Sequence, residues 1–266
     1  MRVVRSSSAL PVALLGLSIL IVGCKGGATN GASTNAGNAN ANAAQPDGAK
    51  VEIKTTQPGT GVAAKNGDLL AMRYTGRLTN GEVFDSNTTK QPLNLVLGSG
   101  SVIKGWEEGL QGIKIGEKRS LKIPSSKAYG EQGNDKIPPN SELVFDIECL
   151  DVLPAGDMDK IARETLRPGT GAELKTGQTV TFNFRGLLVD GTEFDSSYKG
   201  QPVTVELGAG RLNPAALDDA MVGLKVGGKY RLKFPPQFAF GAQGSQSTKV
   251  PGNSVVYFIV EPTAAK

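Results

Sequence analysis

The segment YTGRLTNGEVFDS, residues 74–86, returns as FRGLLVDGTEFDS, residues 184–196. Almost every distinctive residue from Pro58 to Phe145 has such a counterpart, at an offset that grows from 110 positions (74 to 184) to 113 (145 to 258). A period this long indicates a duplicated domain, because solenoid repeats run at roughly 20–50 residues. We therefore predict two tandem domains, over residues 51–153 and 161–266, joined by a linker at 154–160.

Both copies show the alternation of apolar and polar residues that is typical of β-strands. The inward positions of the first clear strand repeat in phase: Leu70, Met72 and Tyr74 in one copy, and Val180, Phe182 and Phe184 in the other. Further alternating runs contain Leu93, Leu95 and Leu97, then Leu121 and Ile123, and finally Phe145 and its counterpart Phe258.

Only one short helix fits each copy. Trp106 and Leu110 are four positions apart, as on one face of a helix. In the second copy, Asn213-Pro214 predicts an N-cap and a first helical residue, followed by the same apolar spacing at Leu217 and Met221. Many short antiparallel strands with one helix per unit predict the α+β class, in which an antiparallel sheet curls around a short helix.

Residues 1–23 predict a bacterial lipoprotein signal peptide. Arg2 and Arg5 precede an apolar run at 9–22, which is shorter than the roughly 20 residues of a membrane-spanning helix. The run ends at Cys24 in an arrangement that resembles a lipobox, whose cysteine is acylated and becomes the mature N-terminus; the alternative is an ordinary secretory signal that happens to contain a cysteine. Residues 24–50 have almost no large apolar side chain, so we expect a lipidated cysteine and a flexible tether.

These features predict a protein held by lipid in the bacterial cell envelope. We expect the periplasmic side of the outer membrane in a Gram-negative cell and the outer face of the cytoplasmic membrane otherwise; Lys25, rather than Asp, after the cysteine favours the outer membrane. Loss of two leader arginines lowers the net charge from +4 to +2. A charge this small gives no sign of a nucleic-acid partner.

The sequence contains no histidine and two cysteines. With Cys24 acylated, Cys149 would have no partner for an internal disulfide. Cys149 lies in phase with Phe145 and Ile147, which predicts a buried structural thiol.

Five motifs follow one another in the first copy: Tyr74-Thr75-Gly76, Phe84-Asp85-Ser86, Val102–Gly109, Ala128-Tyr129-Gly130 and Ile137–Asn140. Together they resemble the FKBP-type peptidyl-prolyl cis/trans isomerases over nearly all of residues 51–153, and residues 161–262 resemble a more divergent member. The resemblance implies isomerisation of Xaa-Pro bonds in proline-containing segments of unfolded or partly folded exported proteins. It implies no metal and no cofactor.

The resemblance also implies a shallow apolar pocket for the prolyl ring. Its expected residues are Trp106 as the floor, Tyr74, Phe84, Ile103 and Phe145 as the walls, and Val102, Tyr129 and Ile137 at the rim. In the family, a backbone N–H at the Ile103 position and the hydroxyl at the Tyr129 position hold ligand carbonyls. The alternative interpretation is that these aromatic side chains only fill the core.

Asp85 is the one charged residue predicted beside the pocket. In a functional role its carboxylate orients neighbouring polar groups or faces the twisted carbonyl; the alternative is a strand-end residue that bonds the adjacent turn. Family members often carry an arginine partner shortly before the proline of Gln91-Pro92. This sequence departs from that pattern, because Thr88, Thr89 and Lys90 stand there.

The second copy departs from the first at the pocket positions, which predicts a weak or inactive domain. Its equivalents are Phe184 and Phe240 for the two tyrosines, Leu217 for the tryptophan, Val250 for the isoleucine, and the retained Phe194, Asp195 and Phe258. Pro214, which has no N–H, stands opposite Ile103. The runner-up to an enzyme is therefore a binding module, such as a holdase-type chaperone, that grips proline-containing segments without turnover.

Overall fold

The computed structural model describes residues 49–266. The predicted leader at 1–23, the predicted lipidation site Cys24 and nearly all of the predicted tether at 24–50 lie outside the described residues. Within residues 49–266, no helix is long and apolar enough to cross a membrane.

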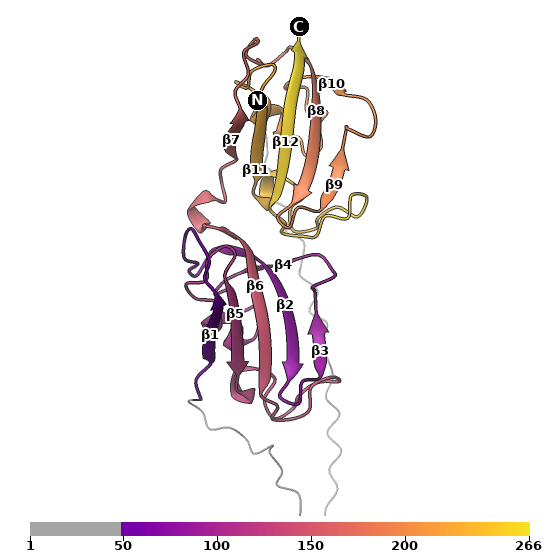
Figure 1. Cartoon of the computed structure of the whole chain (residues 1–266). Coiled ribbons are helices and arrows are strands. Elements are labelled where there is room, and N and C mark those ends of the chain that lie inside the picture. Colours follow the sequence, from indigo (N-terminus) through magenta and orange to yellow (C-terminus); the bar gives the residue numbers. More distant parts are fainter. Residues whose placement is uncertain (1–48) are drawn as a thin grey trace, which may run out of the picture. The chain divides into compact units, whose positions relative to one another are not determined.

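The first copy folds into a six-stranded antiparallel sheet (Figure 1). In sequence order its strands are β1 (Glu52–Gln57), β2 (Leu69–Leu78), β3 (Val83–Ser86), β4 (Leu93–Val96), β5 (Lys118–Ile123) and β6 (Leu143–Leu153). The order across the sheet is β1-β5-β6-β2-β3, and β4 also pairs with β2. The long central pair of β2 and β6 runs from Leu69 opposite Leu153 to Leu78 opposite Leu143.

The second copy repeats this topology. Its strands are β7 (Ala162–Arg167), β8 (Thr179–Leu188), β9 (Glu193–Ser196), β10 (Val203–Glu206), β11 (Lys229–Phe234) and β12 (Val256–Ala265). They are ordered β10-β8-β12-β11-β7, with β9 pairing β8. Each strand pairs with the same neighbours as the equivalent strand of the first copy. The structure therefore confirms two tandem antiparallel sheets with the same topology.

Each domain has one short α-helix among its described residues, as predicted: α1 (Lys104–Gly109) and α2 (Ala216–Met221). Single 3₁₀ turns occur at Ser125–Lys127, Ala155–Asp157 and Pro236–Phe238. The predicted start of the second helix was wrong, since its N-cap is Ala215 rather than Asn213. The Pro214 carbonyl accepts a hydrogen bond from the Leu217 N–H at 3.0 Å. The chain thus enters α2 through a tight turn that begins at Pro214 and overlaps the first residues of the helix.

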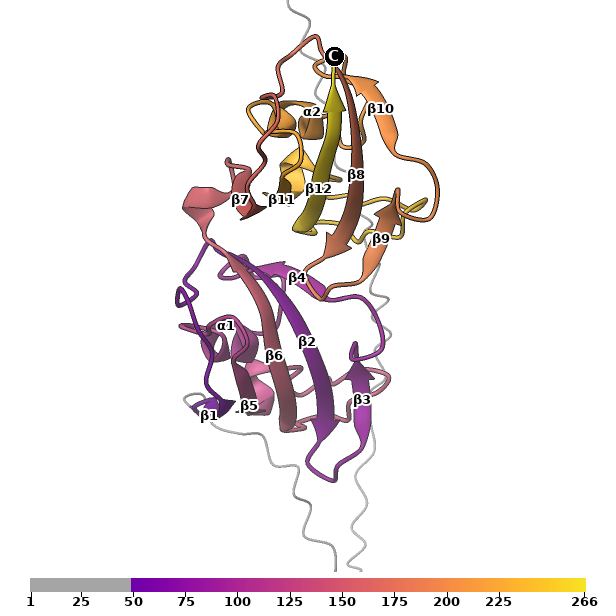
Figure 2. The same ribbon diagram turned by 45° about the horizontal axis from the view of Figure 1, so that its top comes forward.

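The helix α1 packs closely on β5 (Figure 2). A Cβ at Gly105 would overlap the side chain of Ile123, so glycine permits this approach. The end of α1 is also fixed, because the Arg119 guanidinium of β5 donates to the carbonyls of Gly109 at 2.7 Å and Gln111 at 2.8 Å. Contacts with β5 therefore help to fix the position of α1.

Arg119 is itself paired with a buried carboxylate. Its Nε donates to Oε1 of Glu117 at 2.7 Å, and both side chains are less than a tenth exposed. Burial acts to raise the pKa of Glu117, but hydrogen bonds from Arg119 and from the Lys114 N–H outweigh it and lower the pKa below its ordinary 4.5. Glu117 is therefore charged, and its hydrogen bonds with Arg119 and the Lys114 N–H stabilise the turn before β5.

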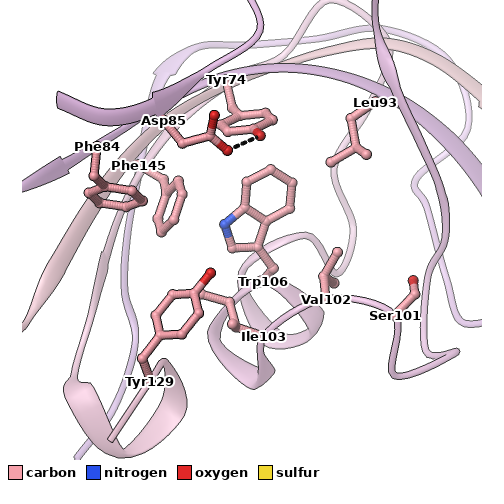
Figure 3. A pocket seen from close by; sticks show the side chains of 10 residues that line it. All are labelled: Tyr74, Phe84, Asp85, Leu93, Ser101, Val102, Ile103, Trp106, Tyr129 and Phe145. Carbon is pink, nitrogen blue, oxygen red and sulfur yellow. Dashed lines mark hydrogen bonds between the residues drawn. The ribbon is translucent and has the colours of Figure 1, made fainter. Parts of the chain in front are cut away.

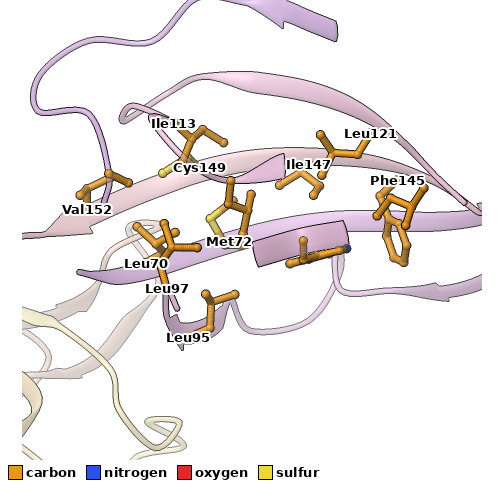
Figure 4. Packing of buried hydrophobic residues seen from close by; sticks show 14 of the residues in the cluster. Leu70, Met72, Leu95, Leu97, Ile113, Leu121, Phe145, Ile147, Cys149 and Val152 are labelled. Atoms are coloured by element: carbon orange, nitrogen blue, oxygen red, sulfur yellow. The ribbon is translucent and has the colours of Figure 1, made fainter. Parts of the chain in front are cut away.

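Alternate side chains of β2, β5 and β6 fill the first core (Figure 4). Leu70, Met72 and Leu121 are completely buried, and burial of each such side chain stabilises the fold by about 1.5–3 kcal/mol. Cys149 is also completely buried, which confirms the predicted structural thiol. Burial is the main cause that raises its pKa to about 12.

In the second core, the large side chains occupy different positions from those in the first. Phe182 and Phe234, which are completely buried, replace Met72 and Ile123, while the smaller Leu217 replaces Trp106. Interiors are close-packed, so bulk added under the helix compensates for bulk removed from it. The second domain thus has a core filled by different residues, not a core with lost volume.

Candidate active site

Aromatic side chains surround an open pocket of about 380 Å³ in the first domain (Figure 3). The pocket combines side chains from β2, β3, β4, α1, β6 and two loops. Its lining residues are Tyr74, Phe84, Asp85, Leu93, Ser101, Val102, Ile103, Trp106, Tyr129 and Phe145.

The rings hold one another in edge-to-face contacts. Trp106 is perpendicular to Tyr74, with ring centroids 5.2 Å apart, and to Phe145 at 5.3 Å. Phe84 meets Phe145 in the same manner at 5.5 Å. Such pairs contribute roughly 0.5–1.5 kcal/mol beyond the area they bury. The pocket walls are therefore rigid before any ligand arrives.

A glycine of β2 makes this ring packing possible. A Cβ at Gly76 would lie 2.6 Å from the ring of Phe84 and 2.7 Å from that of Phe145, closer than side chains can approach. Gly76 also pairs with Asp85 in the register of β2 and β3. It therefore leaves space for two walls of the pocket, which explains its place in the Tyr74-Thr75-Gly76 motif.

Asp85 has two hydrogen-bond donors at the edge of the pocket. Its carboxylate accepts from the Tyr74 hydroxyl at 2.5 Å and from the Ser86 N–H at 2.8 Å. Burial first, and then the hydrogen bond to Asp85, raise the pKa of Tyr74 well above its ordinary 10.0, so this hydroxyl remains a donor. The geometry contains both contacts that the two interpretations of Asp85 require.

A buried asparagine, which the sequence did not reveal, fixes the turn that follows Asp85. Asn87 is 6% exposed, and its Oδ1 accepts from the Tyr74 N–H at 2.7 Å. Arg73 braces the same turn by donating to the Thr88 carbonyl at 2.9 Å. The arginine near this turn thus comes from β2 and bonds the backbone rather than the Asp85 carboxylate.

Two donors at the pocket are free to bind a ligand. Among the described residues, neither the Tyr129 hydroxyl nor the backbone N–H of Ile103 has a hydrogen-bond acceptor. Tyr129 is 40% exposed, and Figure 3 shows its hydroxyl directed toward the pocket. The site can therefore offer an apolar floor and two hydrogen bonds to carbonyl oxygens.

Residues 61–150 and 171–262 both match the family of FKBP-type peptidyl-prolyl cis-trans isomerases. The chain belongs to this family. Its two units are FKBP domains, each with the antiparallel sheet and short helix described above.

Relatives cover different shares of the chain. Peptidyl-prolyl cis-trans isomerase FKBP10 of Homo sapiens is 35% identical over 199 residues, which are 74% of this chain and 34% of that protein. FK506-binding protein 4 of Neurospora crassa is 50% identical over 102 residues, 38% of this chain and 22% of that protein. The solved structure of FkpA from Escherichia coli is 45% identical and covers 40% of this chain and 49% of FkpA, with a TM-score of 0.37. The chain spans about a third of the human relative.

In the first FKBP domain, the structure brings together all the predicted pocket residues except Ile137. Ile137, predicted at the rim, is not among the residues that line this pocket; it is 2% exposed and packs in the hydrophobic core. Its loop turns back on itself, because the Ile137 carbonyl accepts from the Asn134 N–H at 2.8 Å. Leu93 and Ser101 were missed. Leu93 starts an alternating run that could have revealed it, whereas an exposed serine gives no such signal.

The second FKBP domain places its loop aromatic differently. Phe240 packs edge-to-face on Phe194 with centroids 5.7 Å apart, and Phe194 in turn contacts Phe258 at 5.7 Å. Tyr129, the counterpart of Phe240, has no ring contact among the described residues. Tyr129 is therefore exposed in the first domain, whereas its counterpart Phe240 packs on Phe194 in the second.

The remaining equivalents show the predicted losses. Asp195 accepts from the Ser196 N–H at 2.8 Å, but Phe184 has no hydroxyl to donate as Tyr74 does. Leu217 and Val250 are each 3% exposed, so both belong to the core. The second domain keeps the strand-end contact of its aspartate and lacks the bond to a ring hydroxyl.

Proposed function

We propose that the first FKBP domain, residues 51–153, catalyses cis/trans isomerisation of Xaa-Pro bonds. The observation that carries this proposal is the aromatic pocket over Trp106. At its edge lie two donors, the Ile103 N–H and the Tyr129 hydroxyl, that have no acceptor within residues 49–266. An apolar floor fits a prolyl ring, and the donors fit the carbonyls on either side of it.

The chemistry needs no group that this chain lacks. Rotation about a peptide bond loses amide resonance, at a barrier of ~18–20 kcal/mol, but it breaks no covalent bond and moves no proton. Uncatalysed exchange takes about 10–100 s. Raising the rate to roughly 10² per second requires a barrier lower by only about 4–6 kcal/mol.

The pocket can supply this difference by binding the twisted amide better than the planar one. A twisted amide has a less polar carbonyl, so a dry aromatic site favours it over the planar ground state. Hydrogen bonds from the Ile103 N–H and the Tyr129 hydroxyl that form only in the twisted geometry add to this preference. Tyr74, already bonded to Asp85, would then serve as a polarised wall rather than as a free donor.

We assign the second FKBP domain a weak or negligible rate. Phe240 brings no hydroxyl and lies on Phe194, and Pro214 has no N–H where Ile103 has one. The retained aromatic side chains Phe194 and Phe258 fit the alternative that this domain only holds proline-containing segments.

The clients we propose are proline-containing segments of exported, partly folded proteins, met at a membrane surface. This proposal rests on the leader-like residues 1–23 and on the lipobox-like position of Cys24. Two or three acyl chains would hold the protein firmly, because each buried CH₂ contributes about 0.8 kcal/mol.

One titration of the full chain tests the activity. Trp106 is the only tryptophan, so its fluorescence reports the floor of this pocket alone. We expect a short Xaa-Pro peptide to change that fluorescence, and the same protein to accelerate isomerisation of the peptide. A fluorescence change without acceleration would favour the binding module. The absence of both effects would refute the proposed site.

A further inference from the structure

A glutamate on α1 bonds the loop that carries the pocket rim. The Glu107 carboxylate accepts from the backbone N–H of Gly98 at 2.5 Å and from that of Gly100 at 2.9 Å. Each oxygen therefore holds one amide, and both bonds are of the charge-assisted kind, which is shorter and stronger than the neutral kind.

These two bonds join two parts of the site. Glu107 directly follows the floor residue Trp106 on α1, and Ser101, Val102 and Ile103, which line the pocket, directly follow Gly100. The Trp106 N–H already bonds the Ile103 carbonyl at 2.9 Å, and the carboxylate adds a second tie, between α1 and the loop that leads into Ile103. We call this contact the Glu107 clamp.

The second domain offers an internal comparison for the clamp. Asp218 stands in place of Glu107 and is shorter by one methylene. Its Oδ2 accepts from the Gly210 N–H at 2.8 Å, the counterpart of the Gly100 bond. Its Oδ1 is buried with no hydrogen-bond partner among the described residues, and Asp218 is only 2% exposed. Half of the clamp is absent in the domain whose pocket has also lost its donors.

We propose that Glu107 is a positioning residue for the isomerisation reaction. Its side chain does not line the pocket, but it holds the loop that leads into the Ile103 N–H against α1. Donors stabilise a transition state only when they are held in place beforehand, and an error of about 1 Å can reduce a rate by up to 10²-fold. This inference rests on the isomerase activity proposed above.

The first test compares Glu107→Gln with Glu148→Gln in the full chain. Glutamine has one acceptor oxygen and an NH₂ group that would face an amide donor, so at least one clamp bond must break. Glu148 is a control with the same change of charge, on β6, where it pairs with Lys118 at 3.6 Å. We expect kcat/KM to fall by roughly tenfold in Glu107→Gln, through kcat more than KM, and to stay constant in Glu148→Gln.

Amide proton shifts separate positioning from folding. In Glu107→Gln the NMR shifts of the Gly98 and Gly100 amides should move while the melting temperature of the domain is largely kept. Moved shifts with an unchanged kcat/KM would overturn the proposal. If this variant does not fold, Glu107→Asp provides the same decision, because it keeps the charge and, like Asp218, should release one amide.

The reciprocal variant tests whether side-chain length decides the second bond. Asp218→Glu should engage the Gly208 amide, shift its proton resonance and raise the melting temperature of the second domain. An unmoved Gly208 resonance would contradict the clamp geometry. If the wild-type chain has no isomerase activity, the proposed function fails. The amide shifts of Gly98 and Gly100 in Glu107→Gln still test the clamp contact, and unmoved shifts would then overturn it.

Discussion

Replacement of Asp85 by asparagine separates a role in catalysis from a role in folding. The carboxylate accepts the Tyr74 hydroxyl and the Ser86 N–H through separate oxygens. Asparagine can keep the Ser86 bond through its oxygen and offer Tyr74 only a neutral hydrogen bond from its NH₂ group. The Ser86 bond is local and easily kept. The change therefore acts on the bond to Tyr74, a wall of the pocket.

The geometry allows an expected magnitude. A hydrogen bond to a charged group contributes about 1.5–3 kcal/mol and a neutral one about 0.5–1.5 kcal/mol, so the exchange weakens the hold on Tyr74 by roughly 1–1.5 kcal/mol. If that hold is realised in the transition state, the isomerisation rate of Asp85→Asn falls by about five- to tenfold. Asp85 is solvent-exposed, so the free energy of unfolding should change by less than about 1 kcal/mol.

The assay is the isomerisation rate of an Xaa-Pro peptide and the melting curve, measured on one preparation of the full chain. Asp195→Asn is a matched control, because Asp195 keeps the strand-end bond to Ser196 but has no tyrosine partner. We expect its rate to equal that of the wild type. An unchanged rate in Asp85→Asn, or an equal loss in both variants, would remove Asp85 from the site.

Three further predictions concern the anchor, the core thiol and the buried ion pair. Cys24→Ser should give an unacylated protein that no longer partitions into detergent; full membrane retention would contradict the lipoprotein proposal. In that background, Cys149 should resist thiol reagents at pH 8 until the domain unfolds, because burial raises its pKa to about 12; rapid labelling of the native protein would refute this. The lowered pKa of Glu117 contributes stability above pH 4.5 that is lost as the pH falls through its folded value, so acid should lower the melting temperature of the first domain less in Glu117→Gln than in the wild type. Equal acid sensitivity of the two proteins would contradict the Glu117–Arg119 account.

The sequence predicted those parts of the fold that depend on local pattern. Alternation located β2, β5 and β6, because burial on one face of a sheet repeats every second residue. The start of α2 was misplaced, since Asn213-Pro214 has the composition of a helix start but the N-cap is Ala215. The loop position of Ile137 follows from the sequence, but the direction of its side chain depends on how that loop folds back.

The polar contacts of the site depend on register, which composition does not reveal. Tyr74 and Asp85 meet because β2 and β3 pair Gly76 with Asp85. The burial of Asn87 and the bonds of Glu107 likewise follow from tertiary contacts of polar residues that resemble surface residues in the sequence. Comparison of the two copies did identify which pocket residues differ, and the structure adds that Phe240 lies on the pocket wall.

The most direct test of the proposed division of labour is the isomerisation rate of each FKBP domain alone. All the strand pairs of each sheet lie within one fragment, residues 51–153 or residues 161–266, so we expect both fragments to fold. Far-ultraviolet circular dichroism and cooperative melting should establish this before the rates are compared. We predict that residues 51–153 accelerate Xaa-Pro isomerisation strongly and that residues 161–266 do so weakly or not at all. Equal rates from two folded fragments would contradict the account, because they would show that neither the free donors nor the open tyrosine of the first pocket decides activity.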